Sequence, residues 1–434
     1  MADVTIRKTE RLRGEVCAPP SKSYTQRMLI AAFLSQGVSK ISGPLFSDDT
    51  EATLRAVKAL GAEVDVAKGC WTASGTASLK GASEPIDCGE SGATLRFMIP
   101  VAALAAEPSV FLLGKSLEQR PIEPLLQSLK QLGVDTSIRK AGGKSYIQVK
   151  GGGIHGGKTS IRGDVSSQFI SGLMFACPKA QEDTVINVTT PLESKGYVQM
   201  TLEVLAKHGV EVIISEDFRT IRIRSGQTYT PYDDRVPGDF SSAAFLLAGA
   251  AITRSKLTFT NLDYSLVQGD KIVIGILKQM GVQGKVCTER IEIEGKEHLL
   301  NPLNLNAKET PDLVPVCAAL ACYADGTSKI HGVQRLRIKE SNRLQSLFLE
   351  LKKMGADINV DEDSLSVKGP CYLHGEEINP HNDHRIAMAC AVAALRAEGK
   401  TIIHNAECVK KSYPTFFIDL SSLGANVVGG KFDR

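Results

Sequence analysis

Ala59-Leu60-Gly61-Ala62-Glu63-Val64 is the first of six stretches in which an apolar, helix-like run ends at a glycine and continues as a β-type run. The other five are Gln131-Leu132-Gly133-Val134, Lys207-His208-Gly209-Val210-Glu211-Val212, Gln279-Met280-Gly281-Val282, Lys353-Met354-Gly355-Ala356-Asp357-Ile358 and Ser422-Leu423-Gly424-Ala425-Asn426-Val427. Their glycines lie 72, 76, 72, 74 and 69 residues apart. A glycine directly after a helix adopts the left-handed conformation at little cost. Six such stretches at a nearly constant period indicate a repeated structural unit.

Each period has the pattern of a helix, a strand, a second helix and two further strands. In the second copy we expect a helix over residues 92–105, a strand over 109–113, a helix over 122–133, and strands over 134–139 and 145–149. Units that alternate helix and strand and end in a hairpin are typical of α/β modules. The chain is therefore predicted to consist of six copies of one α/β module.

The length of the chain predicts more than one domain. At 434 residues it exceeds the size at which single cores usually stop growing, and six modules divide naturally into two groups of three. Pro237-Gly238 marks one crossing after the third module. A second crossing is expected near Ala18-Pro19-Pro20, because a predicted strand over residues 5–16 would complete the other half. We expect one domain from residues 1–19 plus 238–434 and another from 20–237, with the active site in the cleft between them.

The composition is that of an ordinary globular protein, with 43% hydrophobic and 23% charged residues. A net charge of +3 is too small to indicate nucleic acid or a membrane surface as a partner, so anions must be bound by locally placed cations. No uninterrupted apolar stretch is long enough to span a membrane, and the first residues lack the apolar core of a signal peptide. The ten cysteines form no C-x-x-C pair, which favours reduced thiols in the cytoplasm.

Basic side chains gather where the predicted helices begin. A cation at a helix N-terminus opposes the helix dipole, so its repeated occurrence there calls for another explanation. The seven residues are Lys22, Arg27, Arg120, Lys339, Arg343, Arg385 and Lys411. Backbone N–H groups, the positive end of a dipole and a cation together form an anion site. Seven such cations predict that more than one anionic group is bound.

Two carboxylates lie within this basic field. Glu340 lies between Lys339 and Arg343, and Asp312 opens an otherwise apolar predicted helix. Buried near cations, these carboxylates could act as proton carriers. Helix capping or i,i+3 pairing is the alternative, and the residues alone leave both interpretations open.

Two further patterns are not assigned a function. Residues 152–159 match the P-loop pattern, but a P-loop runs from a strand directly into a helix, and a β-like stretch follows here. We therefore expect a glycine-rich loop. His381 and His384 have the spacing of metal ligands, yet no further ligand adjoins them in the required pattern, so we expect no metal.

The motifs of the chain resemble, in order and over nearly its whole length, those of the 5-enolpyruvylshikimate-3-phosphate synthase family. They are Pro20-Ser21-Lys22-Ser23, Ser47-Asp48-Asp49, Ser91-Gly92-Ala93-Thr94-Leu95-Arg96, Arg120-Pro121-Ile122, Ser166-Ser167-Gln168, Gly238-Asp239-Phe240-Ser241-Ser242, Ala324-Asp325-Gly326-Thr327, Lys339-Glu340-Ser341-Asn342-Arg343, Asn382-Asp383-His384-Arg385 and Lys411-Ser412-Tyr413-Pro414. The resemblance implies an α/β fold of two domains, each built from three βαβαββ repeats as an inside-out α/β barrel.

The same resemblance implies an activity in the shikimate pathway, on the route to chorismate and the aromatic amino acids. The family transfers an enolpyruvyl group from phosphoenolpyruvate to the 5-hydroxyl of shikimate 3-phosphate, by addition and then elimination of phosphate. It uses no metal and no cofactor. We expect a cytoplasmic monomer.

The resemblance also implies a role for each matching residue. For shikimate 3-phosphate the binding residues would be Lys22, Ser23, Arg27, Ser166, Ser167, Gln168, Ser194, Asp312, Arg335 and Lys339. For phosphoenolpyruvate they would be Lys22, Gly92, Arg120, Gln168, Arg343, Arg385 and Lys411. In catalysis, Asp312 would take the proton of the 5-hydroxyl, Glu340 would manage the proton at the methylene carbon, and Lys22 would contact both substrates.

Some residues depart from the family's usual pattern. Glu90 stands where an asparagine is usual, Ala93 and Phe97 replace a threonine and a proline, and Arg335 replaces an asparagine and would add a phosphate ligand. The nearest alternative is the sister enzyme that transfers enolpyruvyl to UDP-N-acetylglucosamine. That enzyme carries a reactive cysteine in the loop before its Arg-Pro element, and residues 113–120 contain none. A non-catalytic binding protein is a second alternative, but it would gain nothing from the two carboxylates.

Overall fold

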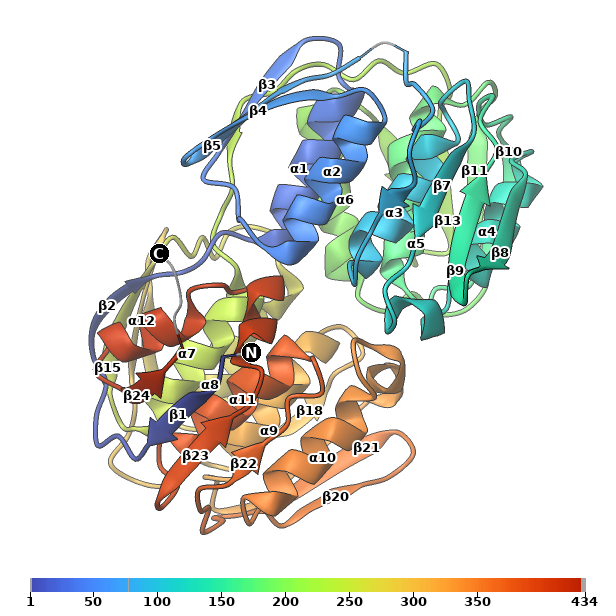
Figure 1. Ribbon diagram of the computed structural model, residues 1–434. Helices are drawn as coiled ribbons and strands as arrows, with labels where there is room; N and C mark the ends of the chain where they lie inside the picture. Colours follow the sequence, from blue (N-terminus) through green and yellow to red (C-terminus); the bar gives the residue numbers. More distant parts are fainter. Residues whose placement is uncertain (1, 77, 431–434) are drawn as a thin grey trace. The chain divides into compact units, whose positions relative to one another are not determined.

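The structure of the protein is a computed structural model that describes residues 2–76 and 78–430 (Figure 1). The chain forms two compact units. Unit 1 consists of Met1–Pro20 with Pro237–Arg434, and unit 2 consists of Ser21–Val236. Each of the two expected domain boundaries lies one residue from the division seen in the structure.

Unit 2 contains three successive modules. The first has α1 (Lys22–Leu34), β3 (Val38–Ser42), α2 (Asp48–Ala59), β4 (Glu63–Ala67) and β5 (Cys70–Ser74). The second has β6 (Ile86–Asp87), α3 (Gly92–Ala102), β7 (Ser109–Leu112), the 3-10 turn η1 (Leu117–Gln119), α4 (Glu123–Gln131), β8 (Thr136–Ala141) and β9 (Lys144–Val149). The third has β10 (Gly157–Ile161), α5 (Ser167–Ala176), η2 (Cys177–Lys179), β11 (Thr184–Val188), α6 (Lys195–Lys207), β12 (Val212–Ile214) and β13 (Thr220–Ile223), and β14 (Asp234–Arg235) follows it.

Unit 1 contains the two N-terminal strands and the other three modules. The strands are β1 (Val4–Arg7) and β2 (Arg13–Cys17). The fourth module has α7 (Phe240–Ile252), β15 (Lys256–Thr260), η3 (Gly269–Ile272), α8 (Val273–Gln279), β16 (Gln283–Val286) and β17 (Arg290–Glu294). The fifth has β18 (Asn304–Asn306), η4 (Pro311–Leu313), α9 (Val314–Ala321), β19 (Gly326–His331), η5 (Gln334–Ile338), α10 (Arg343–Lys353), β20 (Ile358–Val360) and β21 (Ser364–Gly369). The sixth has β22 (Glu377–Ile378), α11 (His384–Ala394), β23 (Lys400–Ile403), η6 (Ala406–Lys411), α12 (Phe416–Ser422) and β24 (Asn426–Gly429).

Every module contributes a four-stranded sheet of the same design. In the second module the order is β6-β7-β9-β8, with β6 parallel to β7 and the other neighbours antiparallel. The third and fifth modules repeat this order as β10-β11-β13-β12 and β18-β19-β21-β20. The predicted α/β class and the repeated βαβαββ module are therefore confirmed.

Three sheets are completed by a strand from elsewhere in the chain. β14 pairs in parallel with β3 of the first module, and β2 pairs in parallel with β15 of the fourth. β1 lies between β23 and β24 of the sixth module and is antiparallel to both. The single strand expected over residues 5–16 is thus wrong in detail, because two strands occur there and each joins a different sheet of unit 1.

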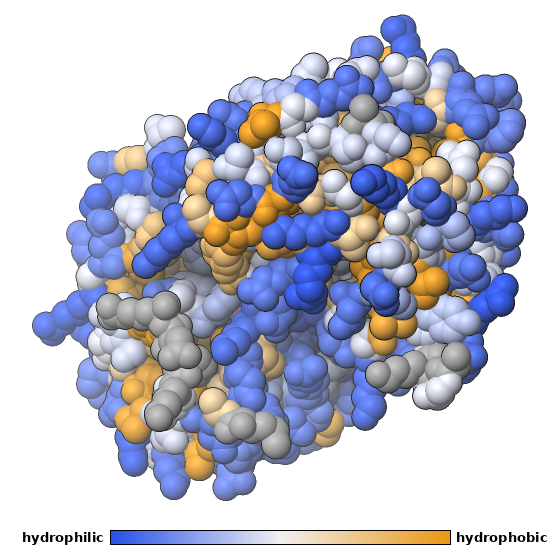
Figure 2. Space-filling model, turned by 45° about the horizontal axis from the view of Figure 1, so that its top comes forward, coloured by the Kyte–Doolittle hydropathy of each residue, from blue (hydrophilic) through white to orange (hydrophobic). Residues whose placement is uncertain are grey.

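The first helix of each module is the main component of the core. α3, α7, α9 and α11 are buried at every position, and α7, α9 and α11 pack against one another in unit 1. The second helices are amphipathic; α4, for example, buries Leu125, Leu126 and Leu129 and exposes its other face. The face drawn in Figure 2 is mainly hydrophilic with interspersed apolar residues. In the part of the chain that the structure describes, no helix combines the length and apolar character needed to cross a bilayer.

The glycines that revealed the repeat have the predicted conformation. Gly61, Gly133, Gly209, Gly281, Gly355 and Gly424 all have φ between 76° and 103°. After α2, the Gly61 amide donates to Lys58 O and the Ala62 amide donates to Val57 O, both at 3.0 Å. These bonds satisfy carbonyl groups at the end of the helix and direct the chain into the next strand.

The segment with the P-loop pattern does not lead into a helix. Gly157 and Lys158 begin strand β10, which pairs in parallel with β11. The expectation of a glycine-rich loop that opens a strand is confirmed, and the geometry that a P-loop needs is absent from this segment.

Candidate active site

Lys22 is held at the start of α1 by a carboxylate. Its Nζ donates to Asp49 Oδ2 at 2.9 Å, and both side chains are largely buried. Ser21 caps α1 and Ser47 caps α2, so the two partners lie in the first turns of adjacent helices. Asp49 offsets the unfavourable position of the Lys22 cation near the helix dipole.

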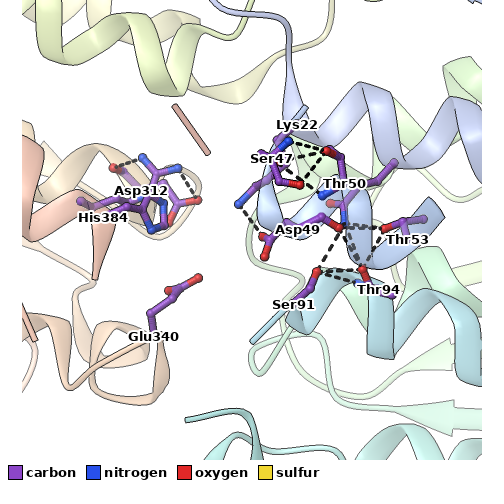
Figure 3. A network of polar contacts seen from close by, with 12 residues as sticks. Lys22, Ser47, Asp49, Thr50, Thr53, Ser91, Thr94, Asp312, Glu340 and His384 are labelled. Carbon is purple, nitrogen blue, oxygen red and sulfur yellow. Dashed lines mark hydrogen bonds and ion pairs between the residues drawn. The ribbon is translucent and has the colours of Figure 1, made fainter. Parts of the chain in front are cut away.

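A hydroxyl and amide network joins this ion pair to the start of α3 (Figure 3). Gln26 Nε2 donates to Thr53 Oγ1 at 2.8 Å and to Asp49 O at 3.1 Å. The Thr94 hydroxyl lies 2.8 Å from the hydroxyls of both Thr53 and Ser91, the N-cap of α3. The N-terminal ends of three helices are thereby held together around Lys22.

Arg27 is a buried cation without a carboxylate partner among the described residues. It is the sixth residue of α1, is 2% exposed, and donates to Thr201 Oγ1, Ser23 O and Tyr197 O at 2.8–3.2 Å. Burial lowers its pKa to about 10. A buried guanidinium attracts an anion more strongly than an exposed one does.

Arg96 fixes the predicted substrate residue Gln168. Its NH1 donates to Gln168 Oε1 at 2.8 Å, its NH2 donates to Pro121 O at 3.1 Å, and its guanidinium lies 5.1 Å from the centre of the Phe169 ring. Although Arg96 stood within a quoted motif, it was not among the predicted site residues. Its sequence motif gives no hint of contacts to a loop and a helix that follow much later in the chain.

The predicted serines of unit 2 occupy the starts of α5 and α6. Ser166 is the N-cap of α5 and accepts from the Gln168 amide at 3.3 Å, and Ser167 follows it. Ser194 precedes α6 in the left-handed conformation, with φ of 60°. All three are buried, as is expected of hydroxyls that bind a ligand and not bulk water.

Arg120 lies against the backbone of Gly92. A Cβ placed on Gly92 would come within 2.9 Å of Arg120 NH1 and 3.0 Å of Cζ. Any side chain at this position would displace the guanidinium, so the two residues, both expected to bind phosphoenolpyruvate, lie in close contact with each other. Both residues are buried.

In unit 1 the predicted site residues gather around Arg343. We call Asp312, Lys339, Glu340, Arg343, Asp383 and Arg385 the Arg343 cluster. Arg343 donates to Asp312 Oδ1 at 2.9 Å, to Glu340 Oε2 at 2.5 Å and to Asp383 Oδ2 at 2.8 Å. Its side chain is 1% exposed. Although burial opposes it, the charges of Asp383, Glu340 and Asp312 raise the pKa of Arg343.

Asp312 contacts three cations. Besides Arg343, its carboxylate lies 3.4 Å from Arg385 NH2 and 3.6 Å from Lys339 Nζ. Burial opposes ionisation, but Arg385, Lys339 and Arg343 hold the pKa of Asp312 well below its usual value. The carboxylate of Asp312 is therefore ionised. Figure 3 shows Asp312 together with Glu340, the other carboxylate of unit 1 that contacts Arg343.

The three other predicted residues of unit 1 differ in their surroundings. Burial lowers the pKa of Lys339 to about 8, against the attraction of Asp312. Lys411 is buried at the end of η6. Arg335 NH2 donates to Lys308 O at 2.7 Å, next to η4, which carries Asp312.

The predicted placement of the cations at helix N-termini is correct for only part of the set. Lys22, Arg343 and Arg385 lie in the first turn of α1, α10 and α11. Arg27 lies further along α1, whereas Arg120, Lys339 and Lys411 lie at the ends of the 3-10 turns η1, η5 and η6. Asp312 lies in η4 and not in α9. These turns resemble a first helical turn in sequence, so periodicity could not separate them.

Two carboxylates of unit 1, one in the Arg343 cluster and one whose charge interacts with Asp312, were not predicted as site residues. Asp383 is fully buried, caps α11 and binds Arg343 through two oxygens. Asp270, in η3, is 3% exposed, and burial together with the charge of Asp312 raises its pKa to about 6. Asp383 lies in the motif Asn382-Asp383-His384-Arg385 but was given no role in the site, and Asp270 has no flanking cluster of cations in the sequence.

The two histidines of the pair have different surroundings. His381 Nε2 lies 3.0 Å from Glu350 Oε1, and His384 is buried at the start of α11. Among the described residues, no group of three or more His, Cys, Asp or Glu side chains could hold a metal ion.

Repeated βαβαββ modules and clusters of cations and carboxylates at their helix ends define a class of protein, the enolpyruvyl transferase fold. The solved enolpyruvyl transferase NikO from Streptomyces tendae has this fold, with a TM-score of 0.80 and 19% identity over 99% of each chain. The solved EPSP synthase from Acinetobacter baumannii has a TM-score of 0.82 and 26% identity over 99% of this chain and 100% of that one.

The sequence comparisons identify the family. The family model for EPSP synthase (3-phosphoshikimate 1-carboxyvinyltransferase) matches residues 6–420. The 3-phosphoshikimate 1-carboxyvinyltransferase of Methanocaldococcus jannaschii is 42% identical over 97% of this chain and 98% of its own length. That of Clostridium novyi is 41% identical over 98% of each chain. The chain belongs to the EPSP synthase family.

Proposed function

We propose that the chain transfers the enolpyruvyl group of phosphoenolpyruvate to the 5-hydroxyl of shikimate 3-phosphate, with release of phosphate. The product, 5-enolpyruvylshikimate 3-phosphate, is an intermediate in the biosynthesis of chorismate and the aromatic amino acids. Family membership over nearly the whole chain supports this activity. The observation that carries it is the contact of two carboxylates, Asp312 and Glu340, with one buried guanidinium, that of Arg343.

Both substrates carry a phosphate and a carboxylate, and the two units supply cations for them. In unit 2, Lys22, Arg27 and the hydroxyls of Ser23, Ser166, Ser167 and Ser194 would bind shikimate 3-phosphate, while Gly92 and Arg120 would bind phosphoenolpyruvate. In unit 1, Lys339 and Arg335 would serve the first substrate and Arg343, Arg385 and Lys411 the second. Gln168, held by Arg96, would contact both. Arginine suits these positions because its planar fork matches carboxylates and phosphates.

The carboxylates of unit 1 would exchange partners with the substrate. In the ligand-free chain Arg343 and Arg385 hold Asp312 ionised, which makes it a weak base. When phosphoenolpyruvate engages these guanidinium groups, their attraction for Asp312 is shared with the substrate anion. The pKa of Asp312 then rises, and Asp312 becomes better suited to accept the proton of the 5-hydroxyl.

Glu340 would deliver a proton to the methylene carbon in the addition step and remove one in the elimination step. During addition, the 5-hydroxyl oxygen bonds to the central carbon of phosphoenolpyruvate while the methylene carbon becomes a methyl group. During elimination, phosphate leaves and the methyl group loses a proton to regenerate the double bond. The contact of Glu340 with Arg343, the proposed phosphoenolpyruvate ligand, would place its carboxyl near this carbon.

The experiment that tests the proposal is a phosphate-release assay on the purified chain. We expect release only when shikimate 3-phosphate and phosphoenolpyruvate are supplied together, with a new enolpyruvyl ether detected by mass spectrometry. Reactions with each substrate alone are the controls. Turnover with UDP-N-acetylglucosamine in place of shikimate 3-phosphate, or binding of both substrates without turnover, would reject it.

The proposal requires the cations of both units to act on the same substrates, so both units would contribute to one active site. We expect closure on binding, seen as a smaller radius of gyration in small-angle scattering when shikimate 3-phosphate is added. We also propose a cytoplasmic monomer, since reducing conditions suit a chain with ten cysteines and no C-x-x-C pair. Light scattering would test the monomer by its mass.

A further inference from the structure

Glu90 replaces the family's usual asparagine beside the proposed phosphoenolpyruvate site, where a negative charge would repel the substrate. The structure shows where that charge is directed. Its Oε2 accepts from the Ser116 amide and from the Leu117 amide, both at 3.1 Å, and also from the Ser116 hydroxyl. The carboxylate is thus bound to the segment that leads to Arg120, and three donors offset its charge.

The donors belong to the beginning of η1, the turn that ends at Arg120. Ser116 precedes this turn but makes no side-chain cap within it, so Glu90 provides the acceptor for its first amide groups. At the other end of the turn, the Arg120 amide donates to Leu117 O at 3.1 Å. The position of Arg120 therefore depends on the position of a turn that Glu90 anchors.

The loop packs closely against Glu90 at Gly114. A Cβ on Gly114 would lie 2.5 Å from Glu90 Oε1 and 2.6 Å from Gly89 O, and the Gly114 amide donates to Gly89 O at 2.8 Å. Two residues after Glu90, Gly92 supports the Arg120 guanidinium. One short segment, residues 90–92, thus contacts both the start of the turn and the cation at its end.

We propose that Glu90 is a positioning residue that sets the location of the Arg120 guanidinium and thereby the affinity for the phosphoenolpyruvate anion. This inference rests on the proposed function, in which Arg120 binds that substrate. A neutral amide at this position has one acceptor oxygen and two N–H donors. Its oxygen can take the place of Oε2, but the three bonds then go to a neutral acceptor, and its NH2 group stands where Oε1 accepts weakly from the Ser116 amide at 3.4 Å, so it replaces the carboxylate only in part.

The test compares Glu90→Gln with Glu118→Gln, a matched control in the same turn. Glu118 accepts a backbone hydrogen bond from Ser145 in strand β9, outside the turn that ends at Arg120. For Glu90→Gln we expect the KM for phosphoenolpyruvate to rise roughly tenfold or more, since bonds to a charged acceptor are lost. The KM for shikimate 3-phosphate and kcat should stay within roughly threefold, and Glu118→Gln should leave all three constants near those of the parent chain.

A double-mutant cycle separates positioning from a general loss of stability. In an Arg120→Ala background, Glu90→Gln should raise the phosphoenolpyruvate KM little further, because its effect passes through Arg120. Ser116→Ala removes only the hydroxyl donor and should cause a smaller rise in the same KM, which keeps the test valid if Glu90→Gln does not fold.

Three outcomes would overturn the proposal: an unchanged phosphoenolpyruvate KM in folded Glu90→Gln, an equal rise for both substrates, or full additivity with Arg120→Ala. A parent chain that releases no phosphate would instead reject the proposed function. The two failures are therefore distinguishable.

Discussion

Arg343 NH1 lies 2.9 Å from Asp312 Oδ1, and the Arg343 side chain that makes this ion pair is 1% exposed. The same guanidinium also binds Asp383 and Glu340. Carboxylates of the protein thus occupy donors that we assign to phosphoenolpyruvate. Substrate binding would be an exchange of acceptors around a buried cation that never loses all of its partners, which limits the desolvation cost.

Glu340→Gln should separate binding from catalysis. The amide keeps the shape and an oxygen that can accept from Arg343, but it cannot donate or accept a proton as a carboxyl does. We expect kcat to fall by roughly a hundredfold or more, a typical loss for a general acid–base group. Substrate affinity, measured by calorimetry, should change only a few-fold. Normal turnover of this variant would reduce Glu340 to an ion-pair partner of Arg343.

Lys339 should give the reaction an alkaline limit. Burial lowers its pKa to about 8, so the ammonium loses its proton as the pH rises through that value. The kcat/KM for shikimate 3-phosphate reports on the free enzyme and should therefore decline above pH 8. Lys339→Arg, which stays charged, should move the decline to higher pH. If the kcat/KM of Lys339→Arg declines at the same pH as that of the parent chain, the titration belongs to another group.

Asp270→Asn should stabilise the chain at neutral pH. The folded-state pKa is about 6, above the value of roughly 3.9 expected when unfolded, so stability is full below pH 4 and falls as the pH rises through 6. The penalty above pH 6 is on the order of 2–3 kcal/mol, and the amide removes it. We expect denaturant unfolding to show a gain at pH 7.5 that is much smaller at pH 4.5. The exposed Asp325→Asn serves as the control. An equal effect of Asp270→Asn at both pH values would contradict the assignment.

Arg96→Lys should weaken the binding of both substrates indirectly, because Arg96 contacts Gln168 and Pro121. Lysine cannot reach Gln168 Oε1 and Pro121 O together, so Gln168 and the segment after Arg120 lose a common support. We expect both KM values to rise roughly three- to tenfold, consistent with the loss of one charged hydrogen bond. Arg139→Lys, at an exposed position, should have no effect. A change in only one KM would limit the role of Arg96 to one of its two contacts.

The repeat was predictable because it depends on local chemistry. A glycine that follows a helix reports its own backbone conformation, and all six of the predicted positions have positive φ. The pairing of β1 and β2 with strands of distant modules was not predictable in detail. The two strands are separated only by a short polar segment, and each pairs with a strand hundreds of residues away. No periodic pattern records such pairing.

The cluster around Arg343 shows a similar limit. Glu340 is three residues away, and pairing at this spacing was one of the interpretations left open for it, whereas Asp383 and Asp312 are 40 and 31 residues distant. Sequence patterns located the charged groups but could not show that the cation would be surrounded by carboxylates. The family resemblance implies which substrate each residue binds. The structure shows which carboxylates of the protein contact Arg343.

Unit 2 is inserted in the sequence of unit 1, because β1 and β2 precede unit 2 but pair with strands that follow it. Unit 2 is continuous and carries its own closing strand, β14, whereas unit 1 is interrupted between Pro20 and Pro237. The interrupted ends are adjacent, because Pro20 and Gly238 form a β-bridge and the Asp239 amide donates to Pro19 O at 2.8 Å. A gene that encodes residues 21–236 alone, and another that joins residue 20 to residue 237, would each specify three complete sheets. The two halves could therefore be produced as separate polypeptides and mixed.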